Sequence, residues 1–414
     1  MEATATATPT AARAGDVRVM SLVGFAHGTS HFFHLVIPSL FPWLMVEFGL
    51  NFTAAGTLTT LFFLFSGVGQ AVAGFAVDRW GAQRALYAGL LLFALAAVLL
   101  GFSHGYPALA AAAILAGTGN CVFHPADFTI LNRNVSQPRL GAAFSAHGLA
   151  GNLGWAATPV FITGLASLAG WRIAAFAAGI PPLLALSLLL ISRRALAAPA
   201  HAHAPATAPR GSPFAFLGVG AVWMCFFFFL ASTMGVGALQ NFGPLVLKTV
   251  YGLPLTAAAS ALTLYLLGGA AGIAAGGFLA TRYQAHERAV AALLLGAAVL
   301  ALALATGGVP RATVAPLMAL IGFCTGTATP SRDLLVRSAA MERFGQLSFG
   351  RIYGFVYSGL DAGLAAAPIL FGRLLDWGAF TAVLFGVALF QALAAVAALR
   401  VSRGGSAAPA SAPS

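Results

Sequence analysis

The sequence predicts an all-α polytopic membrane protein with twelve transmembrane helices, arranged as two six-helix bundles. Three observations predict this fold class. Of the 414 residues, 59% are hydrophobic and only 7% are charged, with a mean hydropathy of +0.89, whereas a soluble protein carries about 25% charged residues. Apolar runs of about 20 residues, long enough to cross about 30 Å of hydrocarbon, recur along the whole chain. The two halves of the chain also resemble each other.

Each predicted helix is one of these apolar runs, and an even number of spans places both termini on the same side of the membrane. In chain order, the predicted helices cover residues 18–46, 54–77, 84–103, 107–131, 141–166, 170–192, 214–247, 256–281, 289–306, 312–336, 351–372 and 378–400.

The basic residues orient these spans. Only Arg172, Lys248, Arg311 and Arg373 fall on the side opposite the termini, and the other 17 of the 21 Lys and Arg residues fall on the side of the termini. Because cytoplasmic loops carry the excess of Lys and Arg, both termini are predicted to be cytoplasmic. The net charge of +11 therefore reflects topology, and we expect no nucleic-acid partner.

The spans divide into domains at an Ala/Pro-rich stretch without apolar periodicity, residues 193–213. We interpret it as a flexible cytoplasmic linker between bundles at 18–192 and 214–400, and we regard its His201 and His203 as low-complexity sequence. Residues 1–17 and 401–414 are predicted to be disordered cytoplasmic tails.

An internal repeat supports the two bundles. GFAVDRWGAQRALYAGLLL (74–92) aligns with GFLATRYQAHERAVAALLL (277–295), with one inserted residue, and FHPADFTIL (123–131) aligns with ATPSRDLLV (328–336). Such a parallel repeat predicts two bundles related by an axis along the membrane normal, with a substrate site near mid-membrane between them.

The first predicted helix contains an unusual polar stretch, HGTSHFFH (27–34). His27, His31 and His34 are spaced i, i+4, i+7 and lie within about 60° of one helix face. Such a stripe in a membrane helix faces the bundle interior or a water-filled cavity. Because histidine titrates near neutrality, His27 and His31 are candidates for a substrate or proton pathway, and hydrogen bonding between helices is the alternative.

A zinc or nickel site is a second alternative, since His at i, i+4 is a metal-ligand spacing. However, no Cys lies nearby, and the first helix has no acidic residue before Glu47 at its outer end. We therefore predict no metal and no other cofactor.

Other polar residues within predicted spans are further candidates for this pathway. Asp361, in YSGLDAGL near the centre of the eleventh helix, is the clearest, because an intramembrane carboxylate is costly unless paired or protonated. His124 and Asp127 are spaced i, i+3 and could pair; Arg332 occupies the matching place in the second half. The seventh helix should face the first across the repeat axis, which adds Gln240 and Asn241. The remaining candidates are Asn120, His147 and Asn152.

The loop between the second and third helices carries a further motif. It reads Gly74-x-x-x-Asp78-Arg79-x-Gly81-x-x-Arg84, and its second-half counterpart has Thr281 in place of Asp78. We predict that Gly74 lets its helix pack closely and that Asp78 caps a helix or pairs with an arginine as a conformational latch. Spacing, spans and repeat together resemble the major facilitator superfamily, which implies the major facilitator fold.

Residues 20–165 resemble the fosmidomycin-resistance branch of that superfamily. The motifs are FAH (25–27), Gln70, GTGNCVFHP (117–125) and AGNLG (150–154) followed by Pro159, together with the Asp78-Arg79 loop. Members of this branch are inner-membrane efflux carriers driven by proton exchange. The chain departs from the branch at three places: Ser30-His31 replaces Asn-Asp, Ala126 precedes Asp127 after the His-Pro pair, and Thr158-Pro159 replaces Gly-Pro. These departures favour a different substrate or a different proton-carrying group.

The resemblance implies a multi-pass carrier of the bacterial inner membrane, acting as a monomer. We expect proton-coupled export of a small polar or anionic organic compound or drug by alternating access, with the proton gradient as energy source. Two alternatives are proton-coupled uptake of a small carboxylate and a transport-dead membrane sensor. No convincing catalytic set occurs in the sequence, so we predict that the protein is not an enzyme.

Overall fold

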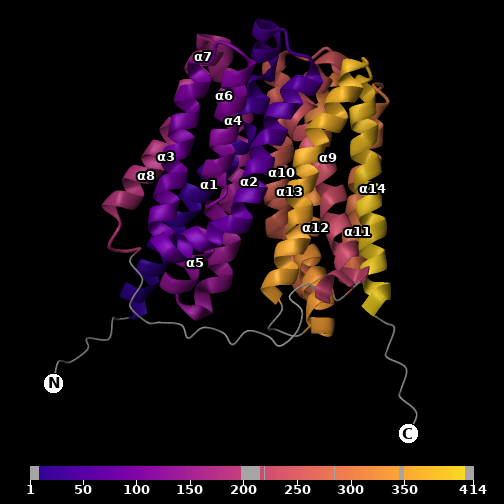
Figure 1. Ribbon diagram of the computed structural model, residues 1–414. Helices are drawn as coiled ribbons and strands as arrows, with labels where there is room; N and C mark the ends of the chain where they lie inside the picture. Colours follow the sequence, from indigo (N-terminus) through magenta and orange to yellow (C-terminus); the bar gives the residue numbers. More distant parts are fainter. Residues whose placement is uncertain (1–8, 197–214, 219, 284, 345–348, 406–414) are drawn as a thin grey trace, which may run out of the picture. The chain divides into compact units, whose positions relative to one another are not determined.

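A computed structural model describes residues 9–196, 215–218, 220–283, 285–344 and 349–405, and nearly all of them are helical (Figure 1). Within each half of the chain, the described segments between the longer helices are short. The first half contains α1 (Pro9–Phe48), α2 (Phe52–Trp80), α3 (Ala82–Gly101), α4 (Tyr106–Asn120), α5 (Phe123–Asn134), the 3-10 turn Gln137–Arg139, α6 (Leu140–Ala169), α7 (Trp171–Ala177) and α8 (Ile180–Ile191).

The second half begins with the 3-10 turn Ala215–Gly218. It continues with α9 (Gly220–Tyr251), α10 (Leu255–Arg282), α11 (His286–Ala305), α12 (Arg311–Phe344), α13 (Phe349–Asp376) and α14 (Phe380–Gly405). Within the described residues, eleven helical segments are long and apolar enough to cross a membrane. The remaining predicted span, 141–166, corresponds to the 30-residue helix α6. Each of the twelve predicted spans therefore coincides with a helical segment.

The chain divides into two compact units. The first unit comprises Met1–Leu40 and Leu64–Ala204, and the second comprises Phe41–Phe63 and Pro205–Ser414. The boundary near residue 204 falls within the predicted linker. Phe41–Phe63, which covers the end of α1 and the start of α2, is however grouped with the second half of the chain.

Both predicted tails are too long. Helix α1 begins at Pro9 and helix α14 ends at Gly405, so residues 9–17 and 401–405 are helical. A tertiary contact explains the first extension. The carboxylate of Asp16, which is buried, accepts hydrogen bonds from the backbone N–H and the hydroxyl of Ser136, at 3.2 and 2.5 Å. Arg139 lies 3.8 Å from the same carboxylate.

Prolines divide two of the predicted spans into shorter helices. The span predicted at 107–131 breaks between α4 and α5 at Cys121 and Val122. Pro125 has no N–H to donate to the carbonyl of Cys121, so the helical ladder is interrupted there. The span predicted at 170–192 breaks between α7 and α8, where Pro181 and Pro182 have the same effect.

Small residues bring the helices of the second unit close together. At Gly268, Gly272 and Gly276 of α10, an added Cβ would overlap backbone carbonyls of α12, and at Gly322 and Gly326 of α12 it would overlap backbone carbonyls of α10. Such spacing of small residues lets two membrane helices approach at backbone distance.

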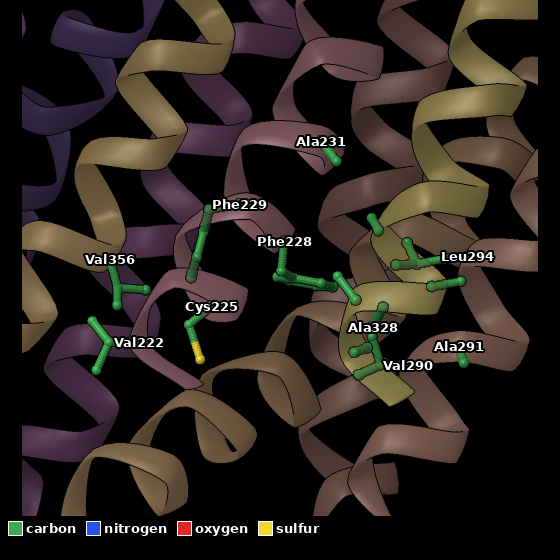
Figure 2. Packing of buried hydrophobic residues seen from close by; sticks show 14 residues of the cluster. Val222, Cys225, Phe228, Phe229, Ala231, Val290, Ala291, Leu294, Ala328 and Val356 are labelled. Carbon is green, nitrogen blue, oxygen red and sulfur yellow. The ribbon is translucent and has the colours of Figure 1, made fainter. Parts of the chain in front are cut away.

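A hydrophobic cluster occupies the core of the second unit. Phe228 and Phe229 of α9 point into it, with Val290 and Leu294 of α11, and Val356 of α13 closes one side (Figure 2). All of these side chains are buried. Because lipid is as apolar as these side chains, close packing rather than exclusion of water stabilises the contact.

The start of α2 is tied to the end of α13. The Asp376 carboxylate accepts hydrogen bonds from the backbone N–H groups of Phe52 and Thr53, at 2.6 and 3.0 Å, and from the Thr53 hydroxyl, at 2.5 Å. Asn51 Oδ1 accepts the Ala54 N–H at 2.8 Å. The first three N–H groups of α2, which lack partners within the helix, are therefore satisfied, two of them by a residue of another helix.

The Asp376 contact makes the first testable prediction. Asp376→Asn keeps the size of the side chain but removes its charge and one acceptor oxygen. We expect a loss of about 1 kcal/mol of local stability, a typical value for a helix cap. Backbone amides at the start of α2 should then exchange with deuterium about five-fold faster, measured by mass spectrometry. Unchanged exchange in that peptide would contradict the capping role.

Candidate functional site

A buried polar centre of the first unit joins α1, α5 and α6. Asp127 of α5 is fully buried, at 0% exposure, and its Oδ2 lies 3.1 Å from His27 Nδ1 of α1 and 3.1 Å from His147 Nε2 of α6. The rings of His27 and His147 stack with their centroids 3.5 Å apart. An ionised carboxylate only accepts hydrogen bonds. If Asp127 is ionised, both rings therefore donate an N–H to the same oxygen. We call His27, Asp127 and His147 the central triad.

Local structure explains why these three residues meet. Asp127 lies near the start of α5, just after the break before Pro125, and its carboxylate reaches α1 and α6. The predicted pair of His124 with Asp127 does not form. Instead, His124 Nδ1 lies 2.9 Å from Gln70 Oε1 of α2.

Glycines allow α1 and α6 to approach at this level. A Cβ at Gly151 would lie 2.8 Å from His31 Nδ1 and 3.1 Å from His27 Nε2, and a Cβ at Gly154 would overlap the carbonyl of Gly28. The GN-x-G motif of α6 therefore has a physical role: Gly151 leaves room for two imidazole rings, and Gly154 lets the backbones touch.

Two more histidines border the central triad. The His31 ring centroid lies 4.5 Å from that of His27, and the His124 centroid lies 5.2 Å from it. Two buried atoms here have no hydrogen-bond partner among the described residues: His31 Nδ1 and Asp127 Oδ1. Because an unsatisfied buried polar atom is costly, these two atoms mark a place where a ligand or ion would gain energy.

A second polar network surrounds Asn120, at the end of α4. Its Oδ1 accepts from the Ser30 hydroxyl at 2.6 Å and from His34 Nε2 at 3.2 Å, and its Nδ2 donates to Ser66 Oγ at 2.8 Å. The indole N–H of Trp155 donates to His34 Nδ1 at 3.1 Å. Since an indole only donates, His34 must carry its proton on Nε2 in this arrangement, and both ring nitrogens are used.

The contacts of Asn120 show that the three histidines of HGTSHFFH have different roles. His34 is a structural link between α1, α4 and α6, whereas His27 and His31 belong to the polar centre. Sequence reasoning missed Ser30, Ser66 and Trp155. The first lies within the stretch itself, and Trp155 lies one helical turn after Gly151, so helical spacing could have indicated both. Asn152 is not part of either network; its Nδ2 donates to the carbonyl of Gly148 in its own helix, at 3.0 Å.

The second unit carries its own buried polar groups on α9. Gln240 and Asn241 are each 3% exposed. Gln240 Nε2 and Asn241 Oδ1 have no hydrogen-bond partner among the described residues. Pro244 lies within the same helix and has no N–H for the carbonyl of Gln240. This part of α9 therefore presents a donor, Gln240 Nε2, beside two acceptors, Asn241 Oδ1 and the Gln240 carbonyl.

Asp361 lies in α13 and is half-buried, and it makes no hydrogen bond or ion pair with any described residue. Ala365, Pro368 and Gly372 follow it at i+4, i+7 and i+11, on the same helical stripe. These three residues contact α2: the Thr60 hydroxyl donates to the Ala365 carbonyl at 2.7 Å, and Cβ atoms added at Gly56 and Gly372 would meet Pro368 and Phe52. Asp361 thus continues the α2-facing stripe by one further turn.

Arg332 of α12 stacks on an aromatic ring. Its Cζ is 4.6 Å from the ring centroid of Phe229. A guanidinium over an aromatic face keeps its charge and gains cation–π stabilisation.

The loop motif is only partly supported. Gly74 is exposed, and an added Cβ would meet no described atom within 4 Å, so its role in close packing stays a prediction. In α2 the close approaches lie at Gly56 and at Gly69, where a Cβ would come within 2.8 Å of Cys121 Cβ. Gly81 has φ of 89°, which explains glycine at the start of α3. Arg79 and Arg84 are exposed, and the Asp78 side chain lies outside the described residues.

Comparisons with known proteins agree with this architecture. Residues 20–349 match the family model described as Major Facilitator Superfamily. The chain is 30% identical over 142 residues to the fosmidomycin resistance protein of Escherichia coli (strain K12), a match covering 34% of this chain and 35% of that protein. It is 24% identical over 376 residues, 85% of each chain, to the membrane sensor protein UhpC of the same organism.

Among solved structures, the chain is similar in fold to a bacterial homologue of the human lysosomal transporter Spinster, in an inward-facing and unoccupied conformation. The TM-score is 0.77 at 14% identity, and the match covers 96% of this chain and 98% of the other.

Proposed function

Because the chain belongs to the Major Facilitator Superfamily, a family of transporters, we propose that it exports a small polar or anionic organic compound in exchange for protons. It would do so as a secondary active carrier of the bacterial inner membrane, with both termini cytoplasmic and a proton gradient as energy source. The similarity of one third of the chain to a fosmidomycin resistance protein supports the export direction.

The proposal that the cargo is polar rests on the unpaired amide groups of α9. Gln240 Nε2 can donate and Asn241 Oδ1 can accept, and both are buried without a partner among the described residues. Polar groups in a membrane helix are costly, and those that persist mark substrate or ion pathways. A small molecule with its own donors and acceptors would satisfy both groups. Arg332 in the same unit offers a cation for an anionic cargo.

Asp361 supplies the proposed coupling group. A carboxyl that lacks a partner among the described residues of a membrane helix is stable when it holds a proton, and such residues form proton relays in carriers. Its place at the inner end of the α2-facing stripe of α13 puts a change of charge next to a helix contact. Loss or gain of the proton would then favour one arrangement of that contact over another.

Proton movement in everted membrane vesicles tests this function. Respiration acidifies the vesicle lumen and quenches a dye, and phosphonates, short carboxylates, amino acids and cationic drugs are then added in turn. An exporter takes its cargo into the lumen and releases protons, so one class should restore the fluorescence, and Gln240→Leu should weaken that response. Vesicles without the protein are the control. Quenching by a carboxylate in vesicles that are not respiring would instead establish proton-coupled uptake.

The similarity to a membrane sensor favours a second candidate, a membrane sensor without transport activity. Deleting part of the linker at 193–213 distinguishes the two. A carrier should tolerate the deletion, because the linker only joins the units, whereas a sensor that signals through this segment should lose its response. Transport of any compound that survives the deletion would exclude the sensor.

A further inference from the structure

We infer that the central triad is a binding site for a divalent first-row transition-metal ion. The proposed ligands are His27 Nδ1, an Asp127 carboxylate oxygen and His147 Nε2, one from each of three helices. This inference does not depend on the identity of the organic cargo, since it concerns binding within the first unit alone.

The ligand set is chemically suited to such an ion. Imidazole nitrogens and carboxylate oxygens bind zinc, nickel, cobalt and iron, and a site with two histidines and one carboxylate leaves further positions open. The sequence predicts no metal because the first helix lacks an acidic residue. The structure supplies the missing carboxylate from another helix, α5.

The spacing of the donor atoms agrees with a common ion. Two donors about 2.0–2.1 Å from a tetrahedral zinc ion are about 3.3 Å apart. Asp127 Oδ2 lies 3.1 Å from His27 Nδ1 and 3.1 Å from His147 Nε2, and one ligand atom from each residue lies within 4.8 Å of the others. Small side-chain rotations are therefore enough to point three donors at one centre.

Hydrogen bonding alone does not account for the triad. Asp127 is fully buried, yet its second oxygen has no hydrogen-bond partner among the described residues. A carboxylate in such a position normally has both oxygens satisfied. An ion bound to the carboxylate would engage this oxygen or neutralise its charge, which the two shared N–H groups at Oδ2 do not do.

A neighbouring histidine completes the arrangement. When His27 binds an ion through Nδ1, its N–H moves to Nε2, so the neutral ring keeps its proton. His27 Nε2 and the unpartnered His31 Nδ1 both border Gly151. The two ring centroids are 4.5 Å apart, so a rotation of His31 would let it accept the N–H of His27 and hold that ring in place, as outer partners of metal-binding histidines usually do.

A second set of three histidines, His27, His31 and His124, has similar spacing. It has no carboxylate, so a divalent ion there would place two uncompensated charges in a buried site, which is costly. Both His31 and His124 are also less buried than the members of the central triad. The central triad is therefore the favoured ligand set.

Direct binding to the purified full-length protein tests the inference. The protein carries an affinity tag without histidine, and all variants are made in a His201→Ala/His203→Ala background, because the linker pair could bind metal on its own. Zn²⁺ binding is measured by calorimetry, and Co²⁺ binding by the visible absorption of the bound ion. We expect one high-affinity ion per chain, with Co²⁺ absorption that indicates nitrogen and oxygen ligands.

The variants separate ligands from neighbours. Asp127→Asn and His147→Gln should each weaken Zn²⁺ binding by at least about 100-fold, and His31→Ala by about 10–100-fold as an outer partner. Exposed His104, replaced by alanine, is the matched control and should bind like the parent. Thermal unfolding of each variant shows whether it is folded.

Three results would overturn the inference. The first is no saturable binding in folded parent protein. The second is equal affinity in the parent and in folded Asp127→Asn. The third is loss of binding in His124→Gln without loss in Asp127→Asn, which would assign the ion to the other histidine set.

Discussion

Asp361→Asn is expected to abolish proton-coupled exchange and to leave the protein folded in the membrane. Asparagine has the shape of aspartate but cannot take up or release a proton. If Asp361 carries the coupled proton, the variant can still bind cargo, yet it has no group through which the proton gradient drives a cycle. The expected result in everted vesicles is complete loss of the fluorescence response, with normal amounts of protein.

The surroundings of Asp361 explain why folding should be preserved. Helix α13 packs on α9 through Gly359 and Gly363, where an added Cβ would meet Phe226 and Thr233. Both glycines lie two residues from Asp361, about 200° away around the helix. The side chain therefore points away from this close contact, and a substitution of equal size leaves the contact unchanged.

The same helix provides a matched control. Asp376→Asn makes the identical chemical change at the C-terminal end of α13, where the carboxylate caps α2. We expect this variant to keep proton exchange and to show only faster local hydrogen exchange. Exchange at the wild-type level in folded Asp361→Asn would remove Asp361 from the coupling mechanism. Equal loss of proton exchange in both variants would show that exchange requires the negative charge of α13 and not proton transfer at Asp361.

Much of the fold could be predicted from the sequence, because lipid imposes simple rules. Each apolar run long enough to span the membrane corresponds to a helical segment, since backbone groups in lipid must be satisfied within the helix. The errors lie where tertiary contacts decide. Asp16 holds the first turns of α1 in place through Ser136, a residue 120 positions away, and the α1 sequence gives no sign of it.

The candidate site was predicted in composition but not in arrangement. The helical spacing of HGTSHFFH correctly placed its histidines on one face. It could not show that both ring nitrogens of His34 are hydrogen-bonded, to Asn120 and Trp155. The i, i+3 spacing suggested that His124 pairs with Asp127, whereas in the structure the carboxylate contacts His27 and His147. Pairing across helices depends on their rotation, which a single sequence does not define.

Gly154→Ala is expected to destabilise the protein, although a single methyl group is added. The new Cβ would overlap the backbone carbonyl of Gly28 on α1, and backbone cannot rotate away as a side chain can. Overpacking of this kind typically costs about 1–3 kcal/mol. The control lies in the same helix: a Cβ at Gly164 meets no described atom within 4 Å. Gly164→Ala should therefore stabilise α6 by about 0.5–1 kcal/mol, as Gly to Ala does in helices without a clash.

Thermal unfolding of the two purified variants in detergent checks these opposite changes in stability. Equal stability of Gly154→Ala and the parent would mean that α1 and α6 are farther apart than described here. The proposed metal site offers a second readout, because His27 of α1 and His147 of α6, two of its ligands, lie on the helices that meet at Gly154. To avoid the clash, Gly154→Ala must move α1 away from α6, which separates His27 from both Asp127 and His147. Folded Gly154→Ala should then bind Co²⁺ more weakly than the parent, and Gly164→Ala should bind it equally well. A destabilised variant with unchanged Co²⁺ affinity would show that the ion site does not include His27.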